Sequence, residues 1–150
     1  MTLAESELPV NLLVEILIKN QVKQALAVRR DDTPSANRYM KKVNQARHAL
    51  AAKGNSGRAA LEGLMRHPMP QVRLDGAVSV MQWAPDLAIP VLGRLIAETG
   101  YEKDMSADEL IEVRHEATLS LFDHFGTKYY DRDELIEPLR AYGVDIPSLK

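Results

Sequence analysis

The stretch RAALEGLMRHPMPQVRLDGAVSVMQWA, residues 58–84, decides the fold expected for this chain. It begins with a short apolar segment, is interrupted by Pro68 and Pro70, and continues as a second apolar segment from Val72. Proline ends one helix and is tolerated in the first turn of the next. The stretch therefore predicts a helical hairpin, two helices joined by a tight turn.

The second helix of this hairpin recurs further along the chain. The segment VRLDGAVSVM (72–81) aligns with VRHEATLSLF (113–122) at an offset of 41 residues, with Val, Arg and Ser in register. An offset of roughly 40–47 residues is typical of helical-hairpin repeats. The sequence therefore predicts an all-α fold of about seven helices, built from helical hairpins in a single domain over residues 1–150.

Composition excludes several classes of site. The chain has 150 residues, of which 45% are apolar and 27% charged, as in an ordinary soluble domain. It has no cysteine, which excludes disulfides, thiolate metal sites and cysteine nucleophiles. Residues 1–10 lack the pattern of a signal peptide, and the apolar run at 10–18 is too short to span a bilayer. We expect a cytoplasmic protein with no membrane partner.

Charge is distributed unevenly along the chain. Residues 29–73 hold ten basic and three acidic side chains, whereas residues 74–150 hold seven basic and fifteen acidic ones. The formal net charge is nevertheless only −2. Local fields of this kind steer charged partners even when the total charge is small.

Apolar periodicity and capping residues place the individual helices. Ser106 and Glu109 form a capping-box pattern, which marks the start of the sixth helix. Ser6 and Thr33 are the expected N-caps of the first two helices, and Asp131 that of a last short helix split by Pro138. The expected helices cover residues 7–29, 34–53, 57–66, 70–83, 87–98 and 106–125, followed by that short helix.

Three residues of the repeated helices carry specific expectations. Gly76 lowers helix propensity by about 1 kcal/mol relative to alanine, so we expect a close helix crossing there. Arg73 and Arg114 project from the apolar side of their helices, where an unpaired charge is unfavourable. Each arginine is therefore expected to bind a carboxylate or the carbonyl groups at a helix end.

The hairpin resembles a HEAT repeat. The residues that carry the resemblance are Leu61-Glu-Gly-Leu64, the turn His67-Pro68-Met-Pro70, and Val72-Arg73-x-x-Gly76-Ala77, with a second copy in Val113-Arg114-x-x-Ala117. Residues from about 12 to 96 further resemble a family of short bacterial HEAT-like domains known only as a domain of unknown function. The resemblance implies an α–α superhelix and very little chemistry.

No catalytic, cofactor or metal site is predicted. His115-Glu116 begins like the zinc-protease motif HExxH, but Leu119 stands at the position of the second histidine. No serine lies in a nucleophile elbow, and neither a phosphate loop nor a dinucleotide fingerprint is present. We therefore expect a protein that is not an enzyme and that needs no cofactor.

The sixth helix carries a candidate partner-binding face. Its acidic residues fall within about 60° of one another on a helical wheel, away from the apolar stripe; they are Glu109, Glu112, Glu116 and Asp123. Such a face is either ordinary solvated surface or a recognition face for a basic protein. The second interpretation predicts a non-catalytic protein-binding module, such as a bacterial immunity or antitoxin-type protein that masks a basic toxin, for example a nuclease.

A basic face of the second helix supports an alternative function. Its cations, together with one at the start of the third helix, are suited to a polyanion such as a nucleic acid; they are Arg38, Lys41, Lys42, Lys53 and Arg58. The isoelectric point of about 6.1 and the lack of interleaved aromatic residues argue against this alternative.

Overall fold

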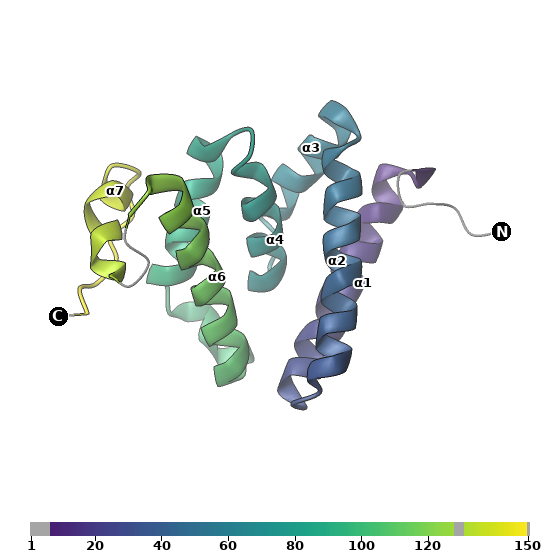
Figure 1. Cartoon of the computed structure of the whole chain (residues 1–150), viewed down its shortest axis with the longest axis horizontal. Coiled ribbons are helices and arrows are strands. Elements are labelled where there is room, and N and C mark those ends of the chain that lie inside the picture. The colour runs from purple at the N-terminus through teal and green to yellow at the C-terminus, as the bar shows by residue number, and fades with distance from the viewer. Residues whose placement is uncertain (1–6, 128–130, 150) are drawn as a thin grey trace.

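The computed structural model describes residues 7–127 and 131–149, and within these ranges every regular element is a helix (Figure 1). The all-α prediction is thus confirmed. The α-helices are α1 (Val10–Arg29), α2 (Thr33–Ala51), α3 (Gly54–Leu64), α4 (Pro70–Val80), α5 (Pro85–Ala97), α6 (Ala107–Phe125) and α7 (Ile136–Arg140). Two 3₁₀ helices, η2 (Gly100–Asp104) and η3 (Arg132–Leu135), precede α6 and α7 respectively.

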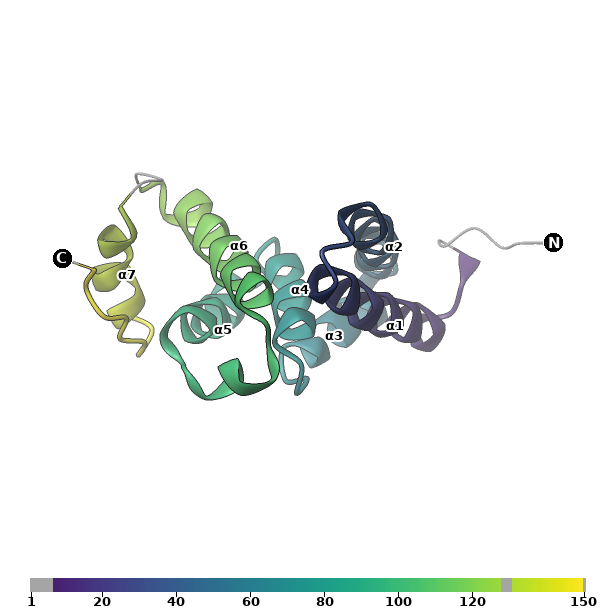
Figure 2. The same cartoon turned by 90° about the horizontal axis from the view of Figure 1, so that it is seen from below.

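The helices follow one another as an array of packed neighbours. Each of the first five helices contacts the next, and the long helices α1 and α2 form the most extensive pair. Seen from below, α2 and α6 stand on the same side of the molecule, with α4 set back between them (Figure 2). α1 also reaches across the array to contact α6. This contact closes one end of the space between α2 and α6.

A continuous apolar core runs through the array from α1 to the C-terminal segment. The aligned residues Val72 and Val113 are both buried in it. Not every apolar residue of α1 joins the core, however. Val22 and Leu26 are 42% and 45% exposed. The apolar surface of α1 is therefore wider than the surface that α2, α3, α4 and α6 cover.

The helix ends follow local chemistry. The Ser106 hydroxyl accepts a hydrogen bond from the Glu109 amide, and the Glu109 carboxylate accepts one from the Ser106 amide, which confirms the predicted capping box. α2 begins one residue earlier than expected because Asp32, and not Thr33, accepts a hydrogen bond from the Ser35 amide. α1 begins at Val10, after Pro9, and the predicted cap Ser6 lies outside the described residues.

The two aligned arginines have equivalent roles. Arg73 donates from Nη1 to the carbonyl oxygens of His67 (3.0 Å) and Pro68 (2.9 Å), just after α3. Arg114 donates from Nη2 to the carbonyl oxygen of Glu98 (3.2 Å), just after α5, and forms an ion pair with Glu102. The expectation that each arginine binds a carboxylate or terminal carbonyl groups is confirmed. Both residues tie the second helix of a hairpin to the end of the first.

Gly76 lies at a close crossing of α3 and α4. A Cβ atom at this position would stand 2.8 Å from the carbonyl oxygen of Leu61 and 3.0 Å from Cβ of Leu64. These distances are shorter than ordinary van der Waals contact. The close crossing predicted from the low helix propensity of glycine is therefore confirmed.

Candidate functional site

A groove lies between α2 and α6, and α4 forms its floor. It has a volume of about 250 Å³ and is lined by Met40, Asn44 and Arg47 from α2, Leu74, Asp75 and Val78 from α4, and Glu112 and Glu116 from α6. A smaller inner pocket of about 30 Å³ adjoins the groove towards α1. Its additional lining residues are Gln21, Gln24, Gln71, Glu109 and Val113.

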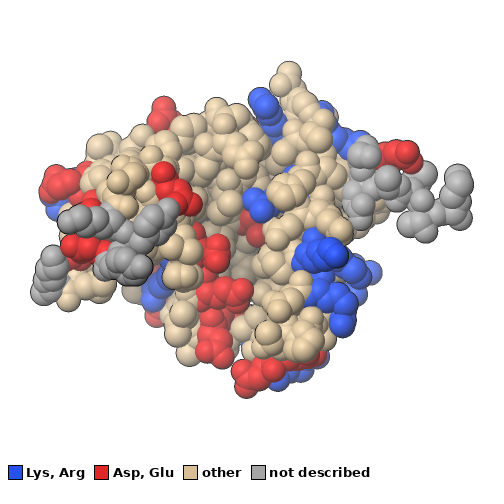
Figure 3. Space-filling view, viewed as in Figure 1, with Lys and Arg blue, Asp and Glu red and all other residues tan. Residues whose placement is uncertain are grey.

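The two sides of the groove differ in charge. Figure 3 shows acidic side chains gathered over α6, where they face the hollow, and basic side chains gathered over α2 on the opposite side. The uneven charge distribution of the sequence thus becomes a difference between the exposed surfaces on the two sides of the groove. Among the described residues that line the groove, Arg47 is the only basic one, whereas Asp75, Glu112 and Glu116 contribute carboxyl groups.

Glu109 does not belong to an exposed acidic face, and this part of the prediction was wrong. The residue is only 2% exposed. Its carboxylate accepts hydrogen bonds from Arg29 Nε (2.9 Å), the Ser106 amide (2.6 Å) and Gln71 Nε2 (3.4 Å). Glu109 therefore joins α6 to α1 and α4. The helical wheel could not reveal this, because α1 comes from the other end of the chain.

The other three predicted acidic residues are exposed on α6, but they do not share one site. Glu112 and Glu116 line the groove, whereas Asp123 is not among its lining residues. Burial raises the pKa of Glu112, and the nearby Glu116 and Glu109 carboxylates raise it further, while a hydrogen bond from Gln24 opposes these effects. Glu112 and Glu116 are thus the predicted residues that the structure brings together.

Two glutamines of α1 extend the site beyond the predicted residues. Gln21 Nε2 donates to Gln24 Oε1 (2.9 Å), and Gln24 Nε2 donates to the Glu112 carboxylate (3.3 Å). Both glutamines are buried. Gln21 follows the buried Leu17 by four residues and so shares its helix face. A polar residue in line with the apolar core positions of a helix is the sequence feature that could have indicated this part of the site.

Asp75 is a buried carboxyl group at the floor of the groove. It is 8% exposed, and its Oδ2 atom has no hydrogen-bond partner among the described residues. Burial raises the pKa of Asp75 to about 8, although the positive charge of Arg47 opposes this effect. The offset of 41 residues aligns Asp75 with Glu116, so the repeat itself signals that both positions face the same side.

Arg47 lies on the α2 wall without forming an ion pair within the described residues. Its guanidinium donates to Asn44 Oδ1 (3.1 Å) and to Ser79 Oγ (3.5 Å), and its Nε atom is buried without a partner. Burial lowers the pKa of Arg47, whereas Asp75 and Glu116 raise it. Arg47 therefore offsets part of the negative charge of the groove but not all of it.

The five residues of the predicted polyanion-binding face are spread over two regions. Arg38, Lys41 and Lys42 are exposed on the first half of α2, and the Arg38 guanidinium lies 5.5 Å from the centre of the Tyr39 ring. Lys53 lies beyond the end of α2, fifteen residues after Arg38 in the sequence, and is only partly exposed. Arg58 instead lies 5.1 Å from the centre of the Trp83 ring. These cations do not form one continuous patch.

The described residues hold no group of three or more His, Cys, Asp or Glu side chains placed to bind a metal ion. None of their helices combines the length and apolar character needed to cross a membrane. His115 and Glu116, which begin like a zinc-protease motif, are both exposed on α6.

Comparison with known proteins identifies the family of the chain. The model of the family described as Domain of unknown function (DUF2019) matches residues 11–114, more than half of the chain. The match spans α1 to α5 and the first part of α6, and it includes the floor of the groove. No curated protein and no solved structure gives a significant match. The chain therefore belongs to the DUF2019 family, a domain of unknown function.

Proposed function

We propose that this chain is a non-catalytic, HEAT-like protein-binding module that holds a basic segment of a partner protein in the groove between α2 and α6. The observation that supports this proposal most strongly is the groove itself, where Glu112 and Glu116 stand above the buried Asp75. The concrete form that we favour is a bacterial immunity protein that masks a basic toxin such as a nuclease.

The HEAT-like character is supported by two helix pairs with equivalent internal contacts. In α3–α4 and in α5–α6, the second helix buries a valine, Val72 or Val113, and places the next residue against the end of the first helix. Proteins built from such pairs bind partners along the surface that successive second helices form. In this chain that surface includes α4 and α6, which supply all the carboxyl groups of the groove.

A basic partner segment suits this groove for electrostatic reasons. Glu112 and Glu116 outnumber the single arginine in the lining even while Asp75 is neutral, so an added cation would meet a net negative field. Complementary charges raise the association rate and suppress wrong partners. The interaction is stronger in a groove than on a flat surface, because the surrounding protein excludes part of the solvent.

A charge-reversal pair tests this proposal. The wild-type chain and the Glu112→Lys/Glu116→Lys variant serve as baits in an extract of the native host. The captured protein is then purified and titrated against both chains by calorimetry. We expect a basic protein whose affinity falls at least roughly 30-fold in the variant and also falls with added salt.

The matched control is Glu15→Lys/Glu98→Lys, which changes the net charge equally at two exposed residues outside the groove. It should retain nearly wild-type affinity. Equal affinities for the wild type and the groove variant would contradict the proposal.

Nucleic-acid binding is the alternative function, and it would use the exposed cations Arg38, Lys41 and Lys42. A mobility assay with short DNA and RNA duplexes across a salt series discriminates between the two functions, since phosphate neutralisation makes affinity fall steeply with salt. Binding at low salt that is lost in Lys41→Glu/Lys42→Glu would favour the alternative over the protein partner.

A further inference from the structure

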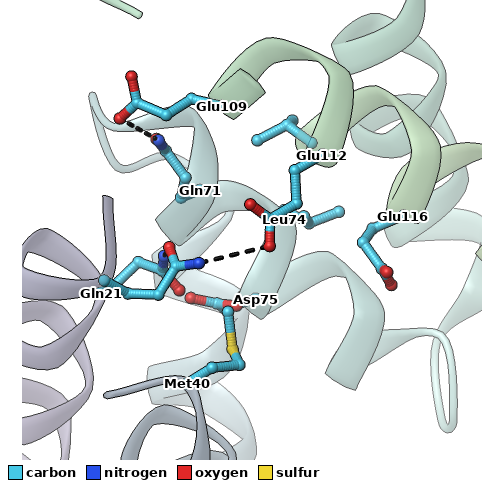
Figure 4. A pocket seen from close by; sticks show the side chains of 10 residues that line it. Gln21, Met40, Gln71, Leu74, Asp75, Glu109, Glu112 and Glu116 are labelled. Atoms are coloured by element: carbon cyan, nitrogen blue, oxygen red, sulfur yellow. Dashed lines mark hydrogen bonds between the residues drawn. The ribbon is translucent and has the colours of Figure 1, made fainter. Parts of the chain in front are cut away.

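The inner pocket contains two buried oxygen atoms without a hydrogen-bond partner among the described residues. They are Oε1 of Gln21, whose side chain is 1% exposed, and Oδ2 of Asp75. Figure 4 shows the Asp75 side chain pointing from α4 towards Gln21 on α1. Buried acceptors without a donor are uncommon because their desolvation is not compensated. While Asp75 is ionised, the described lining of the pocket therefore provides no donor to either oxygen atom.

A third acceptor lies in the same pocket. Figure 4 shows the Glu112 carboxylate extending from α6 into the space above Asp75. Glu112 already accepts a hydrogen bond from Gln24, and a carboxylate has lone pairs for more. Three acceptors thus converge from three helices, whereas Glu116 lies further out with its carboxylate turned away from Gln21. This arrangement fits a small group that carries three donors.

The size and lining of the pocket select the kind of group. A volume of about 30 Å³ has room for one compact polar head, while the adjoining groove of about 250 Å³ has room for a chain behind it. Met40 and Leu74 line both spaces and offer apolar contact to an aliphatic stem. A lysine ammonium is a compact charge with three donors on a four-carbon stem, whereas an arginine guanidinium is a larger planar fork.

We propose that the inner pocket binds the ammonium group of a lysine side chain of the partner protein, with Gln21, Asp75 and Glu112 as its acceptors. This inference rests on the proposed function, because it names the side chain by which the basic segment is anchored. The neighbouring Leu74 and Met40 contact the methylene groups of that lysine, and Glu116 and Arg47 stand at the entrance.

Binding of the cation changes the protonation of Asp75. Without the cation, burial holds the pKa of Asp75 near 8, so the carboxyl group is mostly neutral at pH 7. The groups that face it are Arg47 from α2, Glu112 and Glu116 from α6, and the neutral Gln21 from α1. A bound ammonium favours the ionised carboxylate, so binding releases a proton below pH 8. Affinity should therefore rise as the pH increases from 6 to 8.

Short peptides test the pocket on the chain alone. The probes are acetylated pentapeptides with a central lysine, norleucine or arginine between glycines, and the readout is the methyl signal of Met40 in chains labelled with ¹³C at the methionine methyl groups. At pH 8.5 we expect the lysine peptide to shift this signal in a saturable way. The norleucine and arginine peptides should bind at least roughly tenfold more weakly.

Two variants assign the effect to the pocket. Asp75→Asn and Gln21→Met each remove one acceptor at nearly constant volume, and each should weaken the lysine peptide at least roughly tenfold. Asp123→Asn removes a carboxylate from the same helix as Glu112 but outside the pocket, and should leave binding unchanged. Equal shifts with lysine and norleucine, or wild-type affinity in both pocket variants, would overturn the inference and leave an ordered water as the occupant.

The two proposals fail in different ways. If the captured partner is lost by Glu112→Lys/Glu116→Lys but binds Asp75→Asn and Gln21→Met as tightly as the wild type, the groove stands and the lysine pocket is wrong. If the lysine peptide binds as expected but the captured partner is insensitive to Glu112→Lys/Glu116→Lys, the pocket stands and the proposed function is wrong.

Discussion

Asp75 makes the stability of this protein depend on pH in a way that can be isolated. Its pKa rises from the ordinary value of 3.8 to about 8 on folding, so the folded chain holds this proton more tightly than the unfolded chain. The free energy of unfolding therefore decreases as the pH rises from about 4 to 8, because the unfolded chain releases this proton and the folded chain does not. Above pH 8 the loss is complete.

The Asp75→Asn variant lacks this titration, so its stability relative to the wild type should increase between pH 5 and pH 8.5, by on the order of 3 kcal/mol. Urea unfolding of both chains at several pH values measures the difference, in which the other titrating groups largely cancel. Parallel curves for the two chains would show that Asp75 is not held in a buried, neutral form.

At this scale the sequence predicts some residues and not others, for physical reasons. Arg73 and Arg114 were predicted correctly because a charge on an apolar helix face must find acceptors, and the nearest ones lie at the end of the preceding helix. Gln21 and Asp75 were not predicted as site residues. A single polar residue beside a core position is compatible with either surface or pocket until the neighbouring helices are known.

At the scale of the helices, packing distinguishes two glycines that look equivalent in the sequence. Gly76 meets the backbone of α3, whereas a Cβ atom at Gly63 would have no neighbour within 4 Å. Gly76→Ala should therefore lower the free energy of unfolding by about 1–3 kcal/mol through overpacking. Gly63→Ala is the matched control and should raise it by about 0.5–1 kcal/mol, since alanine has the higher helix propensity. Thermal unfolding of both variants checks the signs, and a stabilised Gly76→Ala chain would exclude a tight crossing.

The start of α6 combines structural and exposed glutamates only one turn apart. Glu109→Gln removes the charge that Arg29 and the Ser106 amide bind, so we expect a loss of about 1.5–3 kcal/mol of stability. Glu112→Gln should change stability by less than about 0.5 kcal/mol, because this residue is exposed. Denaturant unfolding of the two variants distinguishes these roles. Equal losses would mean that Glu112 is also a structural residue.

The capping box and the helical hairpins could be predicted because they depend on residues close together in the sequence. The burial of Glu109 could not, since it depends on Arg29, which lies 80 residues away in the chain. The helical wheel gave the correct direction for Glu112 and Glu116 but no information on what faces them. Only the packing of α1 and α2 against the later helices provides the opposite wall.

At the scale of the whole molecule, charge and shape coincide. The acidic second half of the chain contributes α6, and the basic middle of the sequence contributes α2, so the groove lies between an acidic helix and a helix whose exposed surface is basic (Figure 3). The sequence predicted this charge difference but not the groove. The groove depends on contacts between α1 and α6 that bring distant parts of the chain together.

Site-specific cross-linking tests most directly whether a basic partner segment occupies this groove. The chain has no cysteine, so Val78→Cys places a single photoactivatable label on the groove floor, and Lys19→Cys places one on an exposed position of α1 outside the groove. With the captured partner, we predict a cross-link from position 78 to a lysine-containing segment and none from position 19. A cross-link from position 19 with none from position 78 would contradict the account.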